Sequence, residues 1–82
     1  MPEPQFTEKQ GQYLAFIYAY STIHGYPPAI FDIQRFFAVS GATAQNMVAR
    51  LTDLGLISRI PGAPRSIEIL VDPGCLPVLR RN

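Results

Sequence analysis

The spacing of the apolar residues changes along this chain of 82 residues, and the change falls at Gly55. Before Gly55, apolar side chains recur every three or four residues, which is the period of an amphipathic helix. After it the period is two, as where Ile67 and Ile69 alternate with Ser66 and Glu68, which is typical of a strand. A chain this short makes one domain, so the expected strands must pack back onto the helices that precede them.

Three helices are expected before Gly55, and each has a recognisable boundary. Their expected ranges are about Glu8–His24, Ala29–Phe37 and Gly41–Leu54. Thr7 and Gln10 fit a capping box at the start of the first helix, which Gly25 ends. Pro28 is the expected opening residue of the second helix, and Ser40 is the expected N-cap of the third.

The remaining residues predict a β-hairpin and a tail. The expected strands are Leu56–Ile60 and Arg65–Val71, and the turn between them holds two prolines that cannot donate to a ladder. The expected division is an arm at 1–6, a domain at 7–71 and a tail at 72–82. Three helices followed by a two-stranded hairpin make a winged helix-turn-helix, an α+β fold of mainly helical content. In this fold the third helix can enter the major groove of DNA.

Composition excludes several classes of protein. The formal net charge of +1 is far from that of a strongly basic domain, so charge alone does not identify a nucleic-acid-binding protein. No apolar run approaches the ~18 residues that span a membrane, no secretory signal opens the chain, and the single Cys75 cannot form an internal disulfide. We therefore expect a cytoplasmic protein. With one histidine and one cysteine, we expect no metal site, no cofactor and no enzymatic activity.

Several short stretches of the chain resemble the N-terminal DNA-binding domain of the LexA repressor family. They are Thr7-x-x-Gln10, Gly25-Tyr26-Pro27-Pro28, Ile33-Gln34-Arg35-Phe36, Leu51-x-x-Leu54-Gly55-Leu56-Ile57 and Gly62-Ala63-Pro64-Arg65-Ser66-Ile67. The register holds without a gap from about Thr7 to Leu70, which is most of the chain. The resemblance implies binding to duplex DNA, with bases read by the third helix and the backbone touched by the wing.

The resemblance also implies roles for individual residues. The base-reading positions correspond to Ala42, Thr43, Gln45 and Asn46, the helix-start residue to Ser40, and the wing arginine to Arg65. Phosphate contacts are expected from Ser40, Arg35, Arg50, Arg59 and Arg65. The alternative for all these residues is an ordinary solvated surface, and Arg35 has the further alternative of pairing with Asp32 three residues earlier.

The chain also departs from the family pattern. Family members typically carry acidic side chains where this chain has Gln45 and Asn46, and amides suit adenine rather than cytosine, so the target sequence is not inherited. Gly41 replaces a proline early in the third helix, and Ala29 stands where a side-chain cap is usual. We expect no self-cleaving domain, because the sole lysine, Lys9, lies in the first helix and leaves no Ser/Lys catalytic pair.

The first helix carries apolar residues on a face that a lone monomer should keep polar. They are Ala15, Tyr18, Ala19, Thr22 and Ile23. An apolar patch with tyrosine and small residues is typical of an interface. The alternative is that the tail segment Cys75–Leu79 folds back and covers this face.

Two functions fit these observations. The first is a small sequence-specific transcriptional regulator that binds double-stranded DNA as a homodimer joined through the first helix. The second is a winged helix that docks on another protein through the first helix, with little DNA binding of its own. DNA binding should depend on Gln45, Asn46 and Arg65, whereas protein docking should depend on Tyr18 and Ile23.

Overall fold

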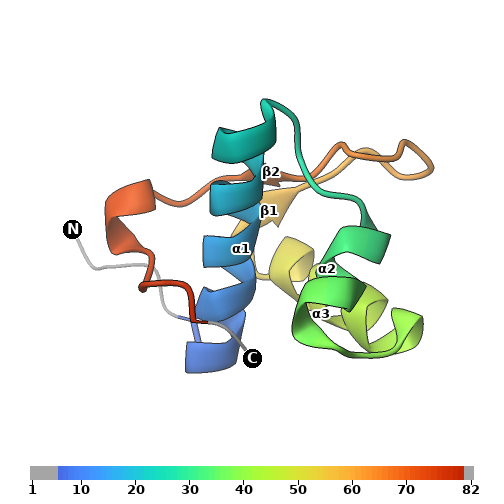
Figure 1. Ribbon diagram of the computed structural model, residues 1–82, viewed down its shortest axis with the longest axis horizontal. Helices are drawn as coiled ribbons and strands as arrows, with labels where there is room; N and C mark the ends of the chain where they lie inside the picture. Colours follow the sequence, from blue (N-terminus) through green and yellow to red (C-terminus); the bar gives the residue numbers. More distant parts are fainter. Residues whose placement is uncertain (1–5, 81–82) are drawn as a thin grey trace.

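The computed structural model describes residues 6–80 and confirms the winged helix-turn-helix fold. Its elements are α1 (Glu8–His24), α2 (Ile30–Phe37), α3 (Gly41–Asp53), β1 (Ile57–Ser58), β2 (Glu68–Ile69) and the short 3-10 helix η1 (Pro73–Cys75). Figure 1 shows α1 standing in the centre, with α2 and α3 on one side of it and the tail on the other. Most of the expected arm, and the last two residues of the expected tail, lie outside the described residues.

The expected capping box at the start of α1 is confirmed. The Thr7 hydroxyl accepts a hydrogen bond from the Gln10 N–H at 3.1 Å, and the Gln10 side-chain oxygen accepts from the Thr7 N–H at 2.9 Å. Gly25 ends the helix with a φ of 78°, a left-handed conformation that glycine adopts without strain. Sequence reasoning therefore located both ends of α1, because each end depends on local chemistry.

The ends of α2 and α3 differ slightly from expectation. The prediction that Pro28 opens α2 is wrong: Ala29 is the N-cap and Pro28 precedes it. Asp32 reaches back so that its Oδ2 accepts from the Ala29 N–H at 2.9 Å, which satisfies one donor at an N-cap that has no side-chain acceptor. At the other end of α2, Ala38 is left-handed with a φ of 54°. The third helix ends at Asp53, one residue earlier than expected.

The strands are much shorter than predicted. Antiparallel pairing joins Ile57 to Ile69 and Ser58 to Glu68, and the expected strands Leu56–Ile60 and Arg65–Val71 are otherwise irregular. The Ser66 hydroxyl accepts from the Ile60 N–H at 3.0 Å and donates to the Ala63 carbonyl at 2.9 Å. These side-chain bonds replace the ladder, and the two prolines and a left-handed Arg65 prevent it from continuing.

The core lies between α1 and the other elements. Its buried residues are Tyr13, Leu14, Phe16, Ile17, Ile33, Ala44, Val48, Leu51, Leu56, Ile57 and Ile67. Aromatic rings join α1 to α2, since Tyr13 stacks on Phe37 with ring centroids 4.0 Å apart and Phe16 stacks on Phe36 at 4.5 Å. The buried face of α1, which carries Tyr13, Leu14, Phe16 and Ile17, is thus the centre of the fold.

The tail covers the first half of α1. The Gln12 side chain donates to the Val78 carbonyl at 2.9 Å and accepts from the Arg80 N–H at 2.8 Å, and Arg80 also forms an ion pair with Glu8. Gly11 permits this close approach, because a Cβ there would lie 3.1 Å from the ring of Pro77. The tail thus packs on the start of α1, and the alternative that it covers the predicted apolar face is wrong for Tyr18 and Ile23, which stay exposed.

Candidate nucleic-acid interface

The third helix separates a buried face from an exposed polar one. Ala44, Val48 and Leu51 are completely buried against the core. The expected base-reading residues all lie on the exposed part of the helix: Ala42, Thr43, Gln45 and Asn46. A helix that is anchored on one side and carries free amide groups on the other has the form that a major-groove reader requires.

Ser40 holds the start of α3. Its hydroxyl oxygen accepts from the Thr43 N–H at 3.1 Å, and the two hydroxyls lie 3.0 Å apart within hydrogen-bond distance. The capping role predicted for Ser40 is thus confirmed. Because the same bond fixes Thr43, the cap also orients the first polar side chain of the exposed face.

The arginines expected to touch phosphate have different surroundings. Arg50 is exposed on the last turn of α3, and Arg59 is half-exposed on the wing, without a hydrogen bond or ion pair to the described residues. Arg35 lies over the ring of Phe31, 5.5 Å from its centroid. The alternative pairing of Arg35 with Asp32 is wrong, because Asp32 pairs with Arg65 at 3.1 Å.

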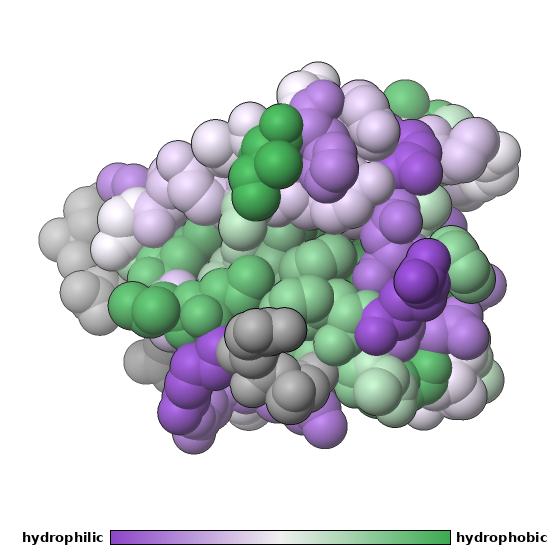
Figure 2. All heavy atoms as spheres, in the orientation of Figure 1, coloured by the Kyte–Doolittle hydropathy of each residue, from purple (hydrophilic) through white to green (hydrophobic). Residues whose placement is uncertain are grey.

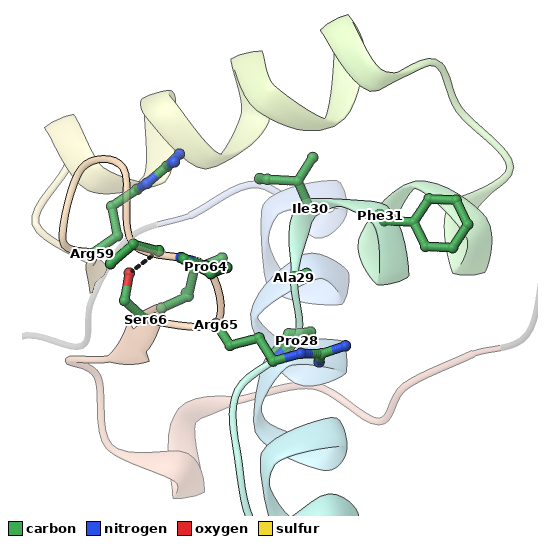
Figure 3. A pocket seen from close by; sticks show the side chains of 10 residues that line it. Pro28, Ala29, Ile30, Phe31, Arg59, Pro64, Arg65 and Ser66 are labelled. Atoms are coloured by element: carbon green, nitrogen blue, oxygen red, sulfur yellow. Dashed lines mark hydrogen bonds between the residues drawn. The ribbon is translucent and has the colours of Figure 1, made fainter.

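A groove of about 260 Å³ separates the wing from the start of α2 (Figure 3). Its lining residues are Pro28, Ala29, Ile30, Phe31, Arg59, Ala63, Pro64, Arg65, Ser66 and Ile67. In the view of Figure 3, Arg59 extends toward α3, whereas Arg65 extends away from Arg59 and past Pro28. The groove therefore has an arginine from the wing on each side, and the two arginines point in different directions.

Arg65 is bound to other parts of the domain. Its Nη1 donates to the Tyr20 hydroxyl at 3.0 Å, to the Asp32 carboxylate at 3.1 Å and to the Pro27 carbonyl at 3.3 Å. Its guanidinium also lies 4.9 Å from the ring centroid of Tyr26. The hydrogen bond to Tyr20 raises the pKa of the Arg65 guanidinium above its ordinary value, and the nearby negative charge of Asp32 adds to the effect.

The apolar face of the first helix is partly exposed. Ala15 is 5% exposed, so the expectation that it lies on the open face is wrong. Ala19 is half-buried and Thr22 is exposed, while Tyr18 and Ile23 are 43% and 76% exposed. Figure 2 shows apolar atoms gathered over α1 and toward the tail. The open part of the face is thus the second half of the helix.

Sequence reasoning missed the partners of Arg65. The sequence predicts no contact between the wing and Tyr20, Tyr26 or Pro27. These residues lie some 40 positions from Arg65 along the chain, and the bonds to Tyr20 and Pro27 span 45 and 38 positions. One signal in the sequence was the group of aromatic residues Tyr20, His24 and Tyr26 near the end of α1. In the structure their rings contact one another, on the side where the wing packs.

The three helices, the two-stranded wing and the exposed face of α3 define a winged helix-turn-helix domain of the kind that binds nucleic acid. The profile described as the LexA DNA binding domain matches residues 3–66. The chain therefore belongs to the LexA DNA-binding domain family.

Similar sequences from individual bacteria agree with this assignment. The LexA repressor of Exiguobacterium sibiricum is 36% identical over 69 residues, which cover 83% of this chain and 34% of the relative. The LexA repressor of Bacillus subtilis is 39% identical over 67 residues, or 80% of this chain and 33% of the relative. The chain thus spans about a third of the length of these relatives. Within residues 6–80, the helices are too short or too polar to span a lipid bilayer.

Proposed function

We propose that this chain is a small, sequence-specific regulator of transcription that binds double-stranded DNA in the cytoplasm of a bacterial-type cell. The observation that carries the proposal is the exposed polar face of α3, held by the Ser40 cap in a domain of the LexA family. This role is that of a binding protein, and the residues described are assigned to contact rather than to catalysis.

The side chains on α3 favour a particular chemistry of base reading. Gln45 and Asn46 can each form two hydrogen bonds with adenine N6 and N7, and Thr43 can bond to several base edges. The methyl group of Ala42 suits contact with a thymine methyl. The target sequence is expected to differ from that of family members with acidic side chains at these two positions. The amides of Gln45 and Asn46 both donate and accept hydrogen bonds, whereas a carboxylate only accepts them.

Contacts with the DNA backbone would hold the domain so that the exposed face of α3 meets the base edges. We propose phosphate contacts for exposed or half-exposed side chains of α2, α3 and the wing, namely Ser40, Arg35, Arg50 and Arg59. The test begins with selection of a duplex from a randomised pool, followed by fluorescence anisotropy at about 50 and 200 mM salt. A log–log slope of about −3 or steeper supports the proposal, and an absence of binding at low salt contradicts it.

Asn46→Ala should weaken binding to the selected duplex and relax its specificity. The expected loss of binding free energy is ~1–3 kcal/mol, because removal of the amide would leave a base edge unpaired. The matched control on the same helix is Arg50→Ala, which should weaken binding to selected and scrambled duplexes alike. Equal losses on both duplexes for Asn46→Ala would exclude Asn46 from base reading.

We further propose that the open half of the α1 face joins two copies of the chain. Its exposed side chains, Tyr18, Thr22 and Ile23, carry no charge, so two copies can meet without repulsion. Two joined domains would bind two half-sites, and the second contact would become intramolecular.

The exposure of Tyr18 and Ile23 also supports a second candidate function, docking of this face on a different protein. The two candidates differ in what the DNA experiment measures. If the protein binds no DNA while variants of Tyr18 and Ile23 abolish a protein complex, the docking function replaces the regulator.

A further inference from the structure

Arg65 joins three segments of the chain that are distant in sequence. From the wing it bonds to Tyr20 on α1, to the Pro27 carbonyl in the connection after α1, and to Asp32 on α2. Asp32 in turn accepts from the Ala29 N–H, so the same carboxylate holds the wing and the start of α2. The Nη1 of the guanidinium is therefore engaged within the domain, on the side of the groove that adjoins α1.

The backbone of Arg65 supports the same interpretation. Its φ is 56°, a left-handed conformation that is uncommon for residues other than glycine. Such a conformation persists where surrounding contacts over-determine it. The adjacent contacts do so here, because Ser66 closes the wing loop through Ile60 and Ala63, and the side chain of Ile67 is buried in the core.

Arg59 is the contrasting arginine of the wing. It lines the same groove, but among the described residues it has no hydrogen bond or ion pair. Figure 3 shows it extending toward α3, whose exposed face carries the proposed base-reading residues. A cation placed there without a partner is free to meet a phosphate when DNA lies along α3.

We propose that Arg65 is a positioning residue rather than a phosphate ligand: its bonds to Tyr20, Pro27 and Asp32 fix the wing against α1 and α2, and thereby place Arg59 beside the DNA backbone. The inference rests on the proposed DNA-binding function. It assigns different roles to two arginines of one wing, and it makes the acidic residue Asp32 a contributor to DNA affinity.

The test compares five forms of the full chain on the selected duplex. They are the wild type, Arg65→Lys, Asp32→Asn, Arg59→Gln and Glu68→Gln. Arg65→Lys keeps the positive charge but replaces the guanidinium, whose Nη1 bonds to all three acceptors, with a shorter ammonium that also loses the planar contact with the Tyr26 ring. Asp32→Asn removes the negative charge that pairs with Arg65, while its remaining carbonyl oxygen can still accept from Ala29. Glu68→Gln is its control, because Glu68 is an exposed acid on β2 whose carboxylate has no hydrogen bond or ion pair to the described residues.

Two readouts separate positioning from phosphate contact. Nuclear magnetic resonance relaxation without DNA gives the order parameters of the wing amides of Ile60, Gly62, Ala63, Arg65 and Ser66. Anisotropy at several salt concentrations gives the affinity and its salt slope. For Arg65→Lys and Asp32→Asn, we expect the order parameters to fall from about 0.85 toward 0.6. We expect both variants to bind DNA about two- to fivefold more weakly, because DNA must then order a looser wing, and to keep the salt slope of the wild type, because Arg59 still meets its phosphate in the complex.

The controls should behave differently. Arg59→Gln should keep a rigid wing and reduce the salt slope by about 0.9, the value of one lost phosphate contact. Glu68→Gln should bind slightly more tightly, because removing an acid lowers repulsion from DNA. A loss of affinity in Asp32→Asn has the opposite sign to that simple charge effect, so it identifies positioning.

The proposal is overturned if Arg65→Lys leaves the wing rigid and Asp32→Asn strengthens binding as much as Glu68→Gln does. Failure of the proposed function is a separate result: the wild type would then bind no duplex. In that case the relaxation measurement still decides whether Arg65 and Asp32 hold the wing.

Discussion

The hydroxyl of Tyr13 lies in the core without a hydrogen-bond partner among the described residues. The ring itself is well packed, since it is fully buried and lies parallel to Phe37 within 2°. Burial of an unpaired hydroxyl costs free energy that a phenylalanine would not incur. Tyr13→Phe should therefore leave the free energy of unfolding unchanged or raise it by up to about 2 kcal/mol, as measured by urea denaturation. A loss of stability of more than about 1 kcal/mol would show that the hydroxyl has a partner.

The same residue makes stability sensitive to alkaline pH. Burial raises the pKa of the Tyr13 hydroxyl above its ordinary value of 10.0. Above pH 10 the unfolded chain therefore holds fewer protons at this site than the folded chain, and stability falls as the pH rises through the folded-state pKa. Below pH 10 the protonated Tyr13 hydroxyl makes its full contribution to the free energy of unfolding. Tyr13→Phe should reduce the alkaline loss, which a series of urea titrations at pH 8 to 11 would detect as a shallower slope (the pH range follows from the ordinary tyrosine pKa of about 10).

At the scale of elements, the C-terminal end of α2 is the place where a substitution should most clearly stabilise the fold. Ala38 has a φ of 54° and an exposed side chain, whereas the corresponding left-handed positions after α1 and α3 are Gly25 and Gly55. Ala38→Gly should raise the free energy of unfolding by about 1 kcal/mol, because glycine adopts this conformation without a Cβ clash. Gly55→Ala is the matched control and should lower it by a similar amount. Thermal denaturation of both variants tests the pair, and a destabilised Ala38→Gly would contradict the argument.

The helices and the strands show how far sequence reasoning reaches. The caps made by Thr7 and Ser40 depend on residues three positions away, so the helix starts beside them were predictable. The strands were predicted too long, because alternation of Ile67 and Ile69 does not reveal the side-chain bonds of Ser66. Local patterns fix helix ends, whereas the extent of a ladder depends on contacts that the pattern does not contain.

At the scale of the whole molecule, the proposed dimer predicts that a charge placed in the α1 face halves the molecular mass in solution. Ile23→Glu should convert a dimer into a monomer, because each interface would bury two unpaired charges. The matched control is Ile60→Glu, since Ile60 is also an exposed isoleucine, 64% against 76%, but lies on the wing. Sedimentation equilibrium without DNA measures both. A wild type that sediments as a monomer, or equal behaviour of the two variants, contradicts the dimer.

The candidate site was also predictable only in part. The four candidate base-reading residues of α3 follow from the family resemblance, and the structure exposes each of them. The engagement of Arg65 was not foreseen, because its bond to Asp32 joins residues 33 positions apart. Ala15 was misplaced for a related reason: periodicity gives the angle of a residue around its helix and leaves open which segment covers it.

The aromatic rings that continue from the core to the wing give this protein an optical signal of its own. The chain has four tyrosines and no tryptophan, and Tyr20 and Tyr26 both lie within 6 Å of the Arg65 guanidinium. Near-ultraviolet circular dichroism depends on fixed aromatic packing. The tyrosine band should therefore report the docking of the wing directly, without a label, while the far-ultraviolet spectrum reports the helices. A partial loss of the first with the second intact would mark a molecule whose wing has come free.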